Sequence, residues 1–333
     1  MRVCWIGVVA ALATAAQVVA QVESRRIEIP AGRDGATEIP VTTIRGSQPG
    51  PTVAFVAGNH GYEYPPILAT QRLRQQIDPK RLRGTVILVH IANVPSFLGR
   101  TIYFSPVDQK NLNRVYPGKP DGTVSERIAH AITEQVIAKA DYVLDLHAGD
   151  GNEDLRPYVY QAITGEAAMD AKIEGLARAF GIDHIVLDRN RPKDPAASLY
   201  CSTTAITRGK PAITVESGYL GNSDEASVAR VVEGARRVLA HLKMTDEKFP
   251  PVARFQVFGR TEVVTAPATG VLEWLVKQDQ TVTAGHVLAR IRDYFGQVQS
   301  EVKAPFAGKV LYIVATPPMV KGQPVAFLGE PVR

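Results

Sequence analysis

Four polar side chains stand where apolar, β-branched segments of the sequence end. His60 and Glu63 follow the segment 51–58 directly, His147 is the last residue of DYVLDLH, and Glu216 is the last residue of PAITVE. Apolar runs of this length are typical of strands buried on both faces of a parallel sheet. Because such sheets build their ligand crevices at the carboxyl ends of the strands, we expect the four side chains to lie close together.

These residue types are suited to bind a metal ion. Two imidazoles and one carboxylate, from His60, His147 and Glu63, would fill three positions of a tetrahedral zinc site and leave the fourth for water. Zinc in such a site lowers the pKa of the water and polarises a carbonyl oxygen. Glu216 would then take the proton of the water and pass it to a leaving amine. The pattern predicts one Zn²⁺ per chain, since no oxygen-rich cluster suits calcium or magnesium.

A second polar group lies between these segments. Asn113 and Arg114 occur in the stretch NLNRVYPG. A planar guanidinium beside an amide can bind a carboxylate through charge-assisted hydrogen bonds. The pair therefore predicts a small-molecule substrate that carries a carboxylate.

The elements that must position these residues alternate along the chain. Between residues 22 and 248, β-branched apolar segments take turns with segments of helical period. Thr123 or Ser125 is suited to cap the second helix, and Asp224 the last. The alternation predicts an α/β fold, a sheet covered by helices on both faces. The expected strands are 51–58, 85–92, 141–147, 184–187 and 211–216, and the expected helices are 64–77, 125–140, 165–180 and 224–242.

The composition excludes several classes of protein. Of the 333 residues, 45% are hydrophobic and 21% are charged, which is typical of globular proteins and unlike disordered chains or coiled coils. The formal net charge of +5 comes from scattered basic residues, so we expect no binding of nucleic acid. The composition leaves the oligomeric state open, a homo-oligomer included.

Residues 1–20 resemble a cleavable signal peptide. Arg2 precedes an uncharged apolar run that ends in Val-Val-Ala. We expect cleavage after Ala20 and a periplasmic protein, with an uncleaved membrane anchor as the alternative. Cleavage would leave Cys201 as the one cysteine, which excludes an internal disulfide and favours a buried, packed thiol.

The last segment, residues 252–333, has a different character. Gly, Pro and β-branched residues follow one another without a helical period, and the pattern Ala-Pro-x-x-Gly at 266–270 occurs once more downstream. Two such halves predict a small all-β domain, similar to the lipoyl/biotinyl-like barrel-sandwich. The hairpin between the halves, 291–302, has no lysine, so we expect no attachment of lipoate or biotin. We expect a cap instead, with Tyr294 and Phe295 either reaching the metal crevice or plugging the barrel end.

Four motifs in this order, GNHGYE, NLNRVYPG, DLHAG and VESG, resemble those of the succinylglutamate desuccinylase/aspartoacylase family. The resemblance covers roughly residues 50–245. It implies the three-layer α/β sandwich of the zinc carboxypeptidases, followed by a C-terminal β-domain.

The resemblance also implies a role for each residue that matches a family motif. The zinc ligands would be His60, Glu63 and His147, and the general acid/base would be Glu216. Asn113 and Arg114 would bind the substrate carboxylate, and Arg100 would polarise the scissile carbonyl. Asp145 either orients the imidazole of His147 or is an ordinary hydrogen-bonding group at the strand end. Aspartoacylases carry a further arginine where residues 202–205 lack one, which argues against N-acetylaspartate as the substrate.

Three functions are compatible with these features. The first is a zinc-dependent hydrolase that cleaves the amide bond of a small, carboxylate-bearing N-acyl amino acid. The second is a periplasmic zinc metallocarboxypeptidase that acts on short or cell-wall peptides, because the same residues would serve it. The third is a binding protein that has lost turnover. The complete ligand set together with Glu216 favours an enzyme.

Overall fold

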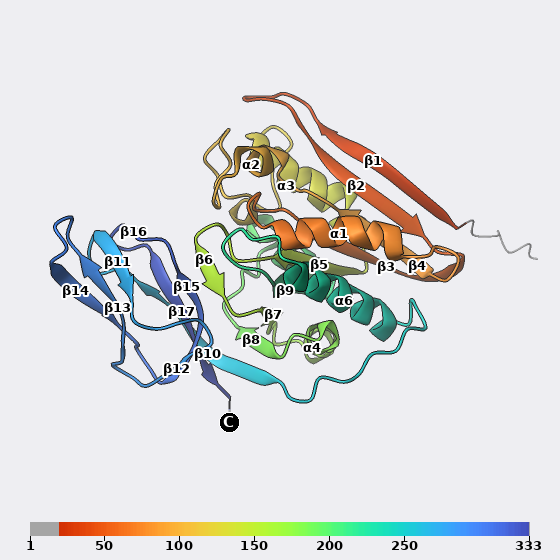
Figure 1. Ribbon diagram of the computed structural model, residues 1–333. Coiled ribbons are helices and arrows are strands. Elements are labelled where there is room, and N and C mark those ends of the chain that lie inside the picture. Colours follow the sequence, from red (N-terminus) through yellow and green to blue (C-terminus); the bar gives the residue numbers. More distant parts are fainter. Residues whose placement is uncertain (1–19, 333) are drawn as a thin grey trace, which may run out of the picture.

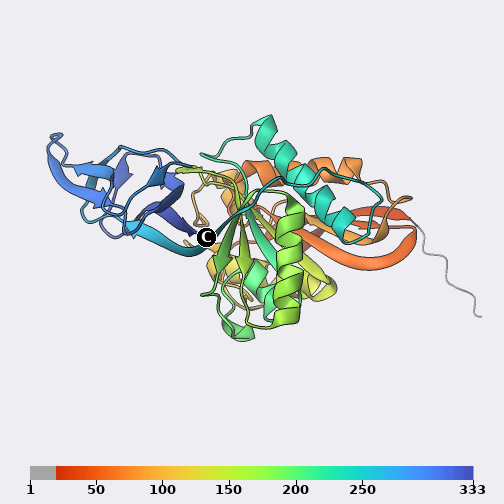
Figure 2. The same ribbon diagram turned by 90° about the horizontal axis from the view of Figure 1, so that it is seen from below.

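The computed structural model describes residues 20–332, so the predicted leader lies outside the described residues except for Ala20. Figure 1 shows an α/β part beside a smaller part built of strands, and Figure 2 shows the smaller part projecting from one end. Among residues 20–332, no helix is both long and apolar enough to cross a membrane.

The elements of the α/β part follow one another as the sequence predicts, with several additions. Its strands are β1 (Gln21–Ile29), β2 (Thr37–Arg45), β3 (Gln48–Ala57), β4 (Arg83–Val89), β5 (Tyr142–His147), β6 (Glu153–Leu155), β7 (Tyr158–Ala162), β8 (His184–Asp188) and β9 (Ala212–Glu216). Its helices are α1 (Tyr64–Gln76), α2 (Val94–Gly99), α3 (Val124–Gln135), α4 (Ala167–Phe180), α5 (Cys201–Ile206) and α6 (Glu225–His241), with 3-10 turns η1 (Leu112–Arg114), η2 (Ile137–Lys139) and η3 (Pro195–Ala197).

The strands of this part lie in the order β1-β2-β4-β3-β5-β9-β7-β8. β4, β3, β5 and β9 pair in parallel, as their apolar sequences predict. β1 and β2 add an antiparallel extension at one edge, and β7 runs antiparallel to β9 but parallel to β8. Because these central strands are parallel, the carboxyl ends of β3, β5 and β9 lie next to one another along one edge of the sheet.

Helix ends follow local sequence signals. Thr123, rather than Ser125, is the N-cap of α3 and forms a capping box with Glu126. The Asp224 side chain caps α6 by accepting a hydrogen bond from the backbone N–H of Ser227. α3 ends earlier than the predicted residue 140, because the chain tightens into η2, where Ile137 turns into the core.

Two apolar cores lie on opposite faces of the sheet. Along β3, Val53 and Phe55 belong to the core under α1, α4 and α6, whereas Ala54 and Val56 belong to the core under α3 and α5. This alternation follows from the two-residue period of a strand. Helices therefore cover both faces, which gives three layers in this part of the chain (Figure 1).

The C-terminal part consists of antiparallel strands around a core of its own. Its strands are β10 (Gln256–Thr265), β11 (Gly270–Trp274), β12 (Thr281–Val282), β13 (Val287–Arg292), β14 (Val298–Lys303), β15 (Gly308–Val314), β16 (Pro318–Met319) and β17 (Pro324–Pro331). Each strand of the first half, β10 to β13, pairs with a strand of the second half, β14 to β17. β10 pairs with β17, β11 with β16, β12 with β15 and β13 with β14. The sequence repeat thus corresponds to two interleaved halves, while the likeness to a lipoyl-type barrel stays a prediction.

One strand joins the two parts. The first residues of β10, Gln256–Phe258, pair in parallel with β8, and the rest of β10 pairs with β17. The central sheet therefore continues into the C-terminal part. The predicted division between residues 248 and 252 falls in the segment just before this shared strand.

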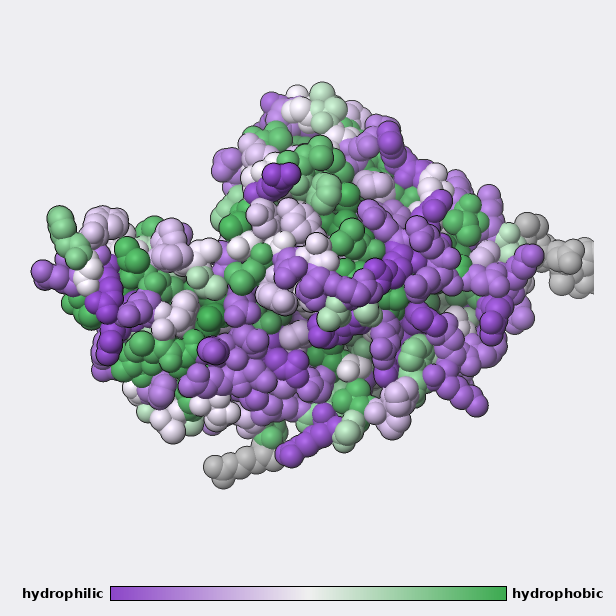
Figure 3. Space-filling view, viewed as in Figure 1, coloured by the Kyte–Doolittle hydropathy of each residue, from purple (hydrophilic) through white to green (hydrophobic). Residues whose placement is uncertain are grey.

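The hairpin of Tyr294 and Phe295 occupies neither predicted position. The two residues are 81% and 91% exposed, so they do not plug a barrel end. Their hairpin, between β13 and β14, lies at the end of the molecule that is remote from the α/β part (Figure 1). The expectation that it reaches the metal crevice is wrong for this structure. Figure 3 shows hydrophobic patches on this end, where Val271, Leu275 and Val298 are also exposed.

Candidate metal centre and active site

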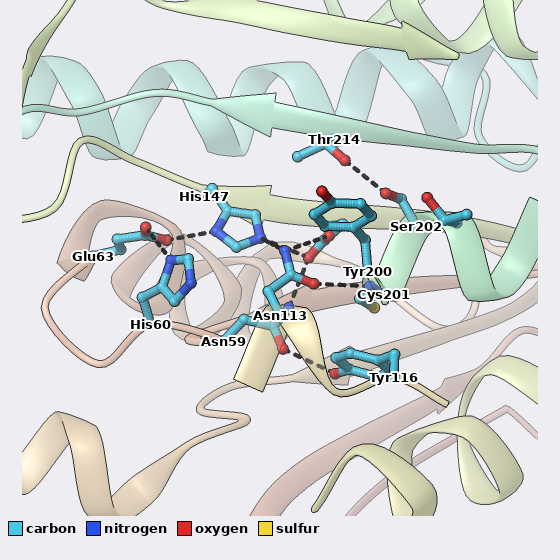
Figure 4. Close-up of polar contacts among 12 residues, drawn as sticks. Asn59, His60, Glu63, Asn113, Tyr116, His147, Tyr200, Cys201, Ser202 and Thr214 are labelled. Atoms are coloured by element: carbon cyan, nitrogen blue, oxygen red, sulfur yellow. Dashed lines mark hydrogen bonds and ion pairs between the residues drawn. The ribbon is translucent and has the colours of Figure 1, made fainter. Parts of the chain in front are cut away.

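The polar residues predicted to act together lie at the carboxyl ends of three neighbouring strands. His60 and Glu63 follow β3, His147 ends β5 and Glu216 ends β9. His147 and Glu216 are directly opposite each other in the parallel pairing of β5 and β9. One donor atom each of His60, Glu63 and His147 lie within 4.8 Å of one another, and all three residues are buried. The structure therefore brings the three predicted ligands together (Figure 4).

The two imidazoles face one carboxylate through the same ring nitrogen. Nδ1 of His60 lies 2.7 Å from one oxygen of Glu63, and Nδ1 of His147 lies 2.8 Å from the other. Nε2 of His60 contacts the side-chain oxygen of Asn111 at 3.0 Å, and Nε2 of His147 contacts a carboxylate oxygen of Asp145 at 3.0 Å. Because these acceptors hold a proton on Nε2, Nδ1 of each ring is available to bind a metal.

Buried polar groups behind His147 hold its ring in this orientation. Asp145 also accepts a hydrogen bond of 2.7 Å from the amide of Asn59, whose oxygen accepts one of 2.8 Å from the Tyr116 hydroxyl. The amide nitrogen of Asn113 donates a hydrogen bond of 3.4 Å to the other oxygen of Asp145. These contacts support the interpretation that Asp145 orients the imidazole.

Two motif glycines are required by close approaches of the chain. A Cβ atom on Gly61 would lie 2.1 Å from the backbone at Ser96 and Phe97 in the middle of α2. Gly218 has a φ of 127°, and a Cβ atom there would lie 2.7 Å from Cγ of Pro65. Only glycine fits at these positions, so the loops after β3 and β9 can pack around the site.

The donor set fits a metal ion of intermediate softness. Two imidazole nitrogens and one carboxylate, without a thiolate, match the ligand types of catalytic zinc sites. A histidine whose second nitrogen contacts a carboxylate, as in His147 and Asp145, is also characteristic of such sites. Cys201 is buried, and it contacts the site through its backbone N–H, which donates to Asn113. The residues present can therefore hold a metal.

The charges of the three ligands depend on one another. Burial alone would raise the pKa of Glu63, but the neighbouring His147 and His60 outweigh it and lower the pKa to about 2. Burial would lower the pKa of His147, but Asp145 and Glu63 raise it well above its ordinary value. Since a metal requires neutral imidazoles, its binding must displace protons from this cluster.

Glu216 has the opposite environment. Burial raises its pKa well above the ordinary value, the carboxylates of Glu63 and Glu153 raise it further, and His147 opposes them. A carboxyl group whose pKa is raised by its surroundings holds a proton more readily than an ordinary carboxylate, as a group that accepts and returns a proton must. Its place beside His147 suits it to act as general acid/base on a group held at the metal.

The residues predicted to bind the substrate carboxylate are held differently. Arg114 is exposed, its guanidinium lies 4.7 Å from the centre of the Tyr200 ring, and it donates to the carbonyl of Asn113. Within residues 20–332, no carboxylate pairs with Arg114. Asn113 is buried, and its oxygen accepts a hydrogen bond of 2.8 Å from the N–H of Cys201. Arg114 is therefore free to bind an anion, whereas Asn113 chiefly supports the site from beneath.

Arg100, the residue expected to polarise the scissile carbonyl, ends α2. It is exposed and has a φ of 50°, and its side chain makes no hydrogen bond or ion pair with any residue from 20 to 332. The structure does not bring Arg100 into contact with the three ligands. Its role stays a prediction from the family resemblance.

Several residues around the site were not predicted. The hydroxyl of Tyr103 donates a hydrogen bond of 2.7 Å to Glu153, and the Tyr103 ring lies edge-on to His60, with ring centres 6.0 Å apart. Asn111, the partner of His60, was marked only by its place in the NLNR motif. No local pattern marks Tyr103, because its position depends on a left-handed backbone conformation, with φ of 56°.

The C-terminal part borders the site through β15. This strand pairs with β6, which follows the His147 loop, and places Tyr312 opposite Leu155. Burial raises the pKa of the Tyr312 hydroxyl well above its ordinary value, and Glu153, Tyr160 and Glu216 raise it further. The contribution of the C-terminal part to the site therefore comes from the strand beside β6, and not from the predicted hairpin.

Comparison with known proteins identifies the family of this chain. The family model of the succinylglutamate desuccinylase/aspartoacylase catalytic domain matches residues 49–242. An N-alpha-acetyl-L-2,4-diaminobutyric acid deacetylase from Halomonas elongata is 32% identical over 276 residues, which are 80% of this chain and 79% of that protein.

Solved structures resemble most of the chain. A product-bound ectoine utilization protein from Ruegeria pomeroyi has a TM-score of 0.84 and 28% identity, covering 95% of this chain and 98% of its own. A succinylglutamate desuccinylase/aspartoacylase from Rhodobacter sphaeroides has a TM-score of 0.83 and 26% identity, covering 93% and 96%. The chain belongs to the succinylglutamate desuccinylase/aspartoacylase family of hydrolases that act on N-acyl amino acids.

Proposed function

We propose that the protein is a zinc-dependent deacylase that hydrolyses the amide bond of small N-acyl amino acids with a free carboxylate. The observation that carries this proposal is the arrangement of His60, Glu63 and His147, with Glu216 directly opposite His147. It combines three ligands for one metal with a separate carboxyl group for proton transfer.

Each residue has a defined task in this proposal. Nδ1 of His60, Nδ1 of His147 and the carboxylate of Glu63 hold the zinc ion. When bound, zinc supplies a Lewis acid that activates water and polarises the acyl carbonyl. Glu216 removes a proton from the attacking water and delivers it to the nitrogen of the leaving amine.

Arg114 binds the carboxylate of the amino acid moiety. Its guanidinium is exposed and lacks a carboxylate partner in the described chain, so a substrate anion would gain a charge-assisted hydrogen bond. Asn113 donates a hydrogen bond of 3.4 Å to Asp145, which contacts Nε2 of His147, and Asn113 stands next to Arg114 in the chain. Through Asn113, the residue that binds the substrate carboxylate is connected to the proposed metal ligand His147.

The similarity to a diaminobutyric acid deacetylase supports an N-acetyl amino acid as the first substrate to test. The decisive experiment incubates zinc-loaded protein with a panel of N-acetyl-L-amino acids, N-succinyl-L-amino acids and tripeptides, and measures products by mass spectrometry. Release of acetate or succinate that is lost in Glu216→Gln supports the proposal. Preferential release of C-terminal residues from peptides would instead identify a metallocarboxypeptidase, and tight binding without any product a binding protein.

We propose further that the enzyme is exported to the periplasm. The signal-like residues 1–20 support this, as does the start of β1 at Gln21, immediately after the expected cleavage point. N-terminal sequencing of the protein from a periplasmic extract should begin at Gln21. A full-length protein in the cytoplasmic or membrane fraction would contradict export with cleavage.

A further inference from the structure

A second arginine lies close to the predicted carboxylate-binding side chain. Arg191 belongs to the segment that follows β8, and its side chain is 16% exposed. Its Nε atom pairs with the carboxylate of Asp188, the last residue of β8. This ion pair fixes the guanidinium of Arg191 at the end of strand β8.

The guanidinium of Arg191 packs against two tyrosine rings. It lies 4.8 Å from the centre of the Tyr200 ring and 5.5 Å from the centre of the Tyr160 ring. Arg114 contacts the same Tyr200 ring at 4.7 Å. Cation–π contacts at these distances are attractive. One tyrosine ring is therefore shared by both arginines.

Arg191 also reaches towards the strand that carries Glu216. Its Nη1 atom lies 3.5 Å from the hydroxyl of Ser202 and 3.4 Å from that of Thr203. Ser202 in turn shares a hydrogen bond of 2.7 Å with Thr214 of β9 (Figure 4). Arg191 is thus connected to the floor of the site as well as to Tyr200.

Tyr200 and Arg114 have few other contacts to fix them. The Tyr200 hydroxyl makes no hydrogen bond to a residue within 20–332, and Arg114 is held by the carbonyl of Asn113 and by the Tyr200 ring. A long, exposed arginine pays a conformational entropy cost when it binds an anion, and a preformed position reduces that cost. The position of Arg114 therefore depends on that of Tyr200, which depends on Arg191.

We infer that Arg191 is a positioning residue that fixes Arg114 through Tyr200 and so sets the preference for substrates with a free carboxylate. The inference rests on the proposed function, because Arg114 has a carboxylate to bind only if the substrate carries one. Arg191 itself keeps its pairing with Asp188 and does not touch the substrate.

The test compares Arg191→Gln with Arg189→Gln, which removes the same charge from an exposed side chain of the same segment. The substrates are the best N-acetyl-L-amino acid of the panel and its α-carboxamide. For the free acid, we expect Arg191→Gln to raise KM about ten- to hundredfold, the range of one charged hydrogen bond, with kcat within about threefold. For the carboxamide, KM should stay unchanged, and Arg189→Gln should match the wild type on both. Arg191→Lys should not restore KM, because an ammonium lacks the planar stacking face.

Equal losses on the acid and the carboxamide, or no change in Arg191→Gln, would overturn the inference. If Arg191→Gln does not fold, as judged by circular dichroism and zinc content, Tyr200→Leu replaces it and should show the same selective rise in KM.

A binding measurement separates this inference from the proposed function. Calorimetry with the N-acetyl-L-amino acid compares zinc-loaded Glu216→Gln with the double variant Glu216→Gln/Arg191→Gln, and needs no turnover. Weaker binding in the double variant supports the positioning role even if the wild type proves inactive, which would refute only the deacylase proposal. If the wild type is active but the single and double variants bind the N-acetyl-L-amino acid equally well, only the role of Arg191 is refuted.

Discussion

Two carboxyl groups of the site, Glu63 and Glu216, differ in their surroundings, and the difference supports the different tasks that we propose for them. The histidines on both sides of Glu63 keep it ionised, as a metal ligand must be. Burial beside Glu63 and Glu153 raises the pKa of Glu216, as suits a group that takes up and returns a proton. Pairs of acids whose environments separate their pKa values are characteristic of acid/base catalysis.

We predict that Glu216→Gln and Glu63→Gln fail in different ways. Glu216→Gln should retain about one zinc per chain and lose kcat by about 10³-fold or more, because proton transfer fails while the ligands remain. Glu63→Gln should lose the metal, since an amide is a poor ligand between two imidazoles. Metal analysis and single-turnover kinetics distinguish the two. Loss of zinc in Glu216→Gln would make Glu216 a ligand instead.

Individual residues were predictable where chemistry and strand ends coincide. His147 and Glu216 end apolar runs, so their types and positions sufficed to expect them at one sheet edge. Arg191 and Tyr200 come from irregular segments whose course depends on packing, and no local spacing relates them to Arg114. Their contact could be recognised only in three dimensions.

At the level of elements, a buried histidine connects α1 with two strands. His90 follows β4, and its two ring nitrogens contact the hydroxyls of Thr42 in β2 at 2.8 Å and Thr70 in α1 at 3.1 Å. Burial lowers the pKa of His90 to about 4, and the nearby Arg74 contributes. The neutral imidazole is therefore the form that the fold requires.

This shift predicts a loss of stability in mild acid. An unfolded histidine takes up a proton near pH 6.5, whereas His90 in the native state does so only near pH 4. Stability from this group is thus fully present above pH 6.5 and falls by about 3 kcal/mol as the pH drops to 4. Urea unfolding between pH 4 and 7 measures the slope. His90→Asn should flatten it, and the exposed His286→Asn should leave it unchanged; an equal slope in His90→Asn would contradict the assignment.

The central parallel strands were easier to predict than the edges of the sheet. Strands such as β3 and β5 are continuous apolar runs, because helices cover both of their faces. β1 is mostly polar and exposed, so it lacks the burial pattern that marks a strand. β7 lies between β9 and β8 although it precedes both in the chain, and the local sequence does not encode that order.

On the scale of the whole molecule, the two parts share buried structure. Tyr158 and Val186 of the α/β part form one apolar cluster with Phe258, Leu311 and Phe327 of the C-terminal part. β6 pairs with β15, and β8 with β10. The C-terminal part is therefore fastened beside the site, while its far hairpin points away from it.

We predict that replacing Tyr294 and Phe295 together by serine changes neither activity nor stability. Both side chains are almost fully exposed, so their loss should alter the free energy of unfolding by less than about 0.5 kcal/mol. The range of accepted N-acyl amino acids should also stay the same. Thermal unfolding and the substrate panel test this. A widened substrate range would restore the gating role, and a large drop in melting temperature would restore the plug.

The shared strand β10 raises the question of whether the two parts unfold together. If residues 1–20 are cleaved as we propose, Trp5 is removed and Trp274 is the single tryptophan. Trp274 lies in β11 of the C-terminal part. Its indole N–H donates a hydrogen bond of 2.7 Å to the carbonyl of Val314. Tryptophan fluorescence therefore reports on the C-terminal part, whereas the helical signal in circular dichroism comes from the α/β part.

We predict that the two signals change at the same urea concentration in the mature protein. Unfolding the C-terminal part alone would expose the shared apolar cluster and break the β8–β10 and β6–β15 pairings, so an intermediate of this kind should be poorly populated. Coincident midpoints, with a single slope, would show one cooperative unit despite the change of sequence character near residue 250. Two separated transitions would show that residues 252–333 unfold as a domain of their own. In that case Phe258→Ala, which removes a fully buried side chain from the shared cluster, should move the two midpoints further apart. The reason is that the variant weakens the contact between the two parts rather than the core of either part.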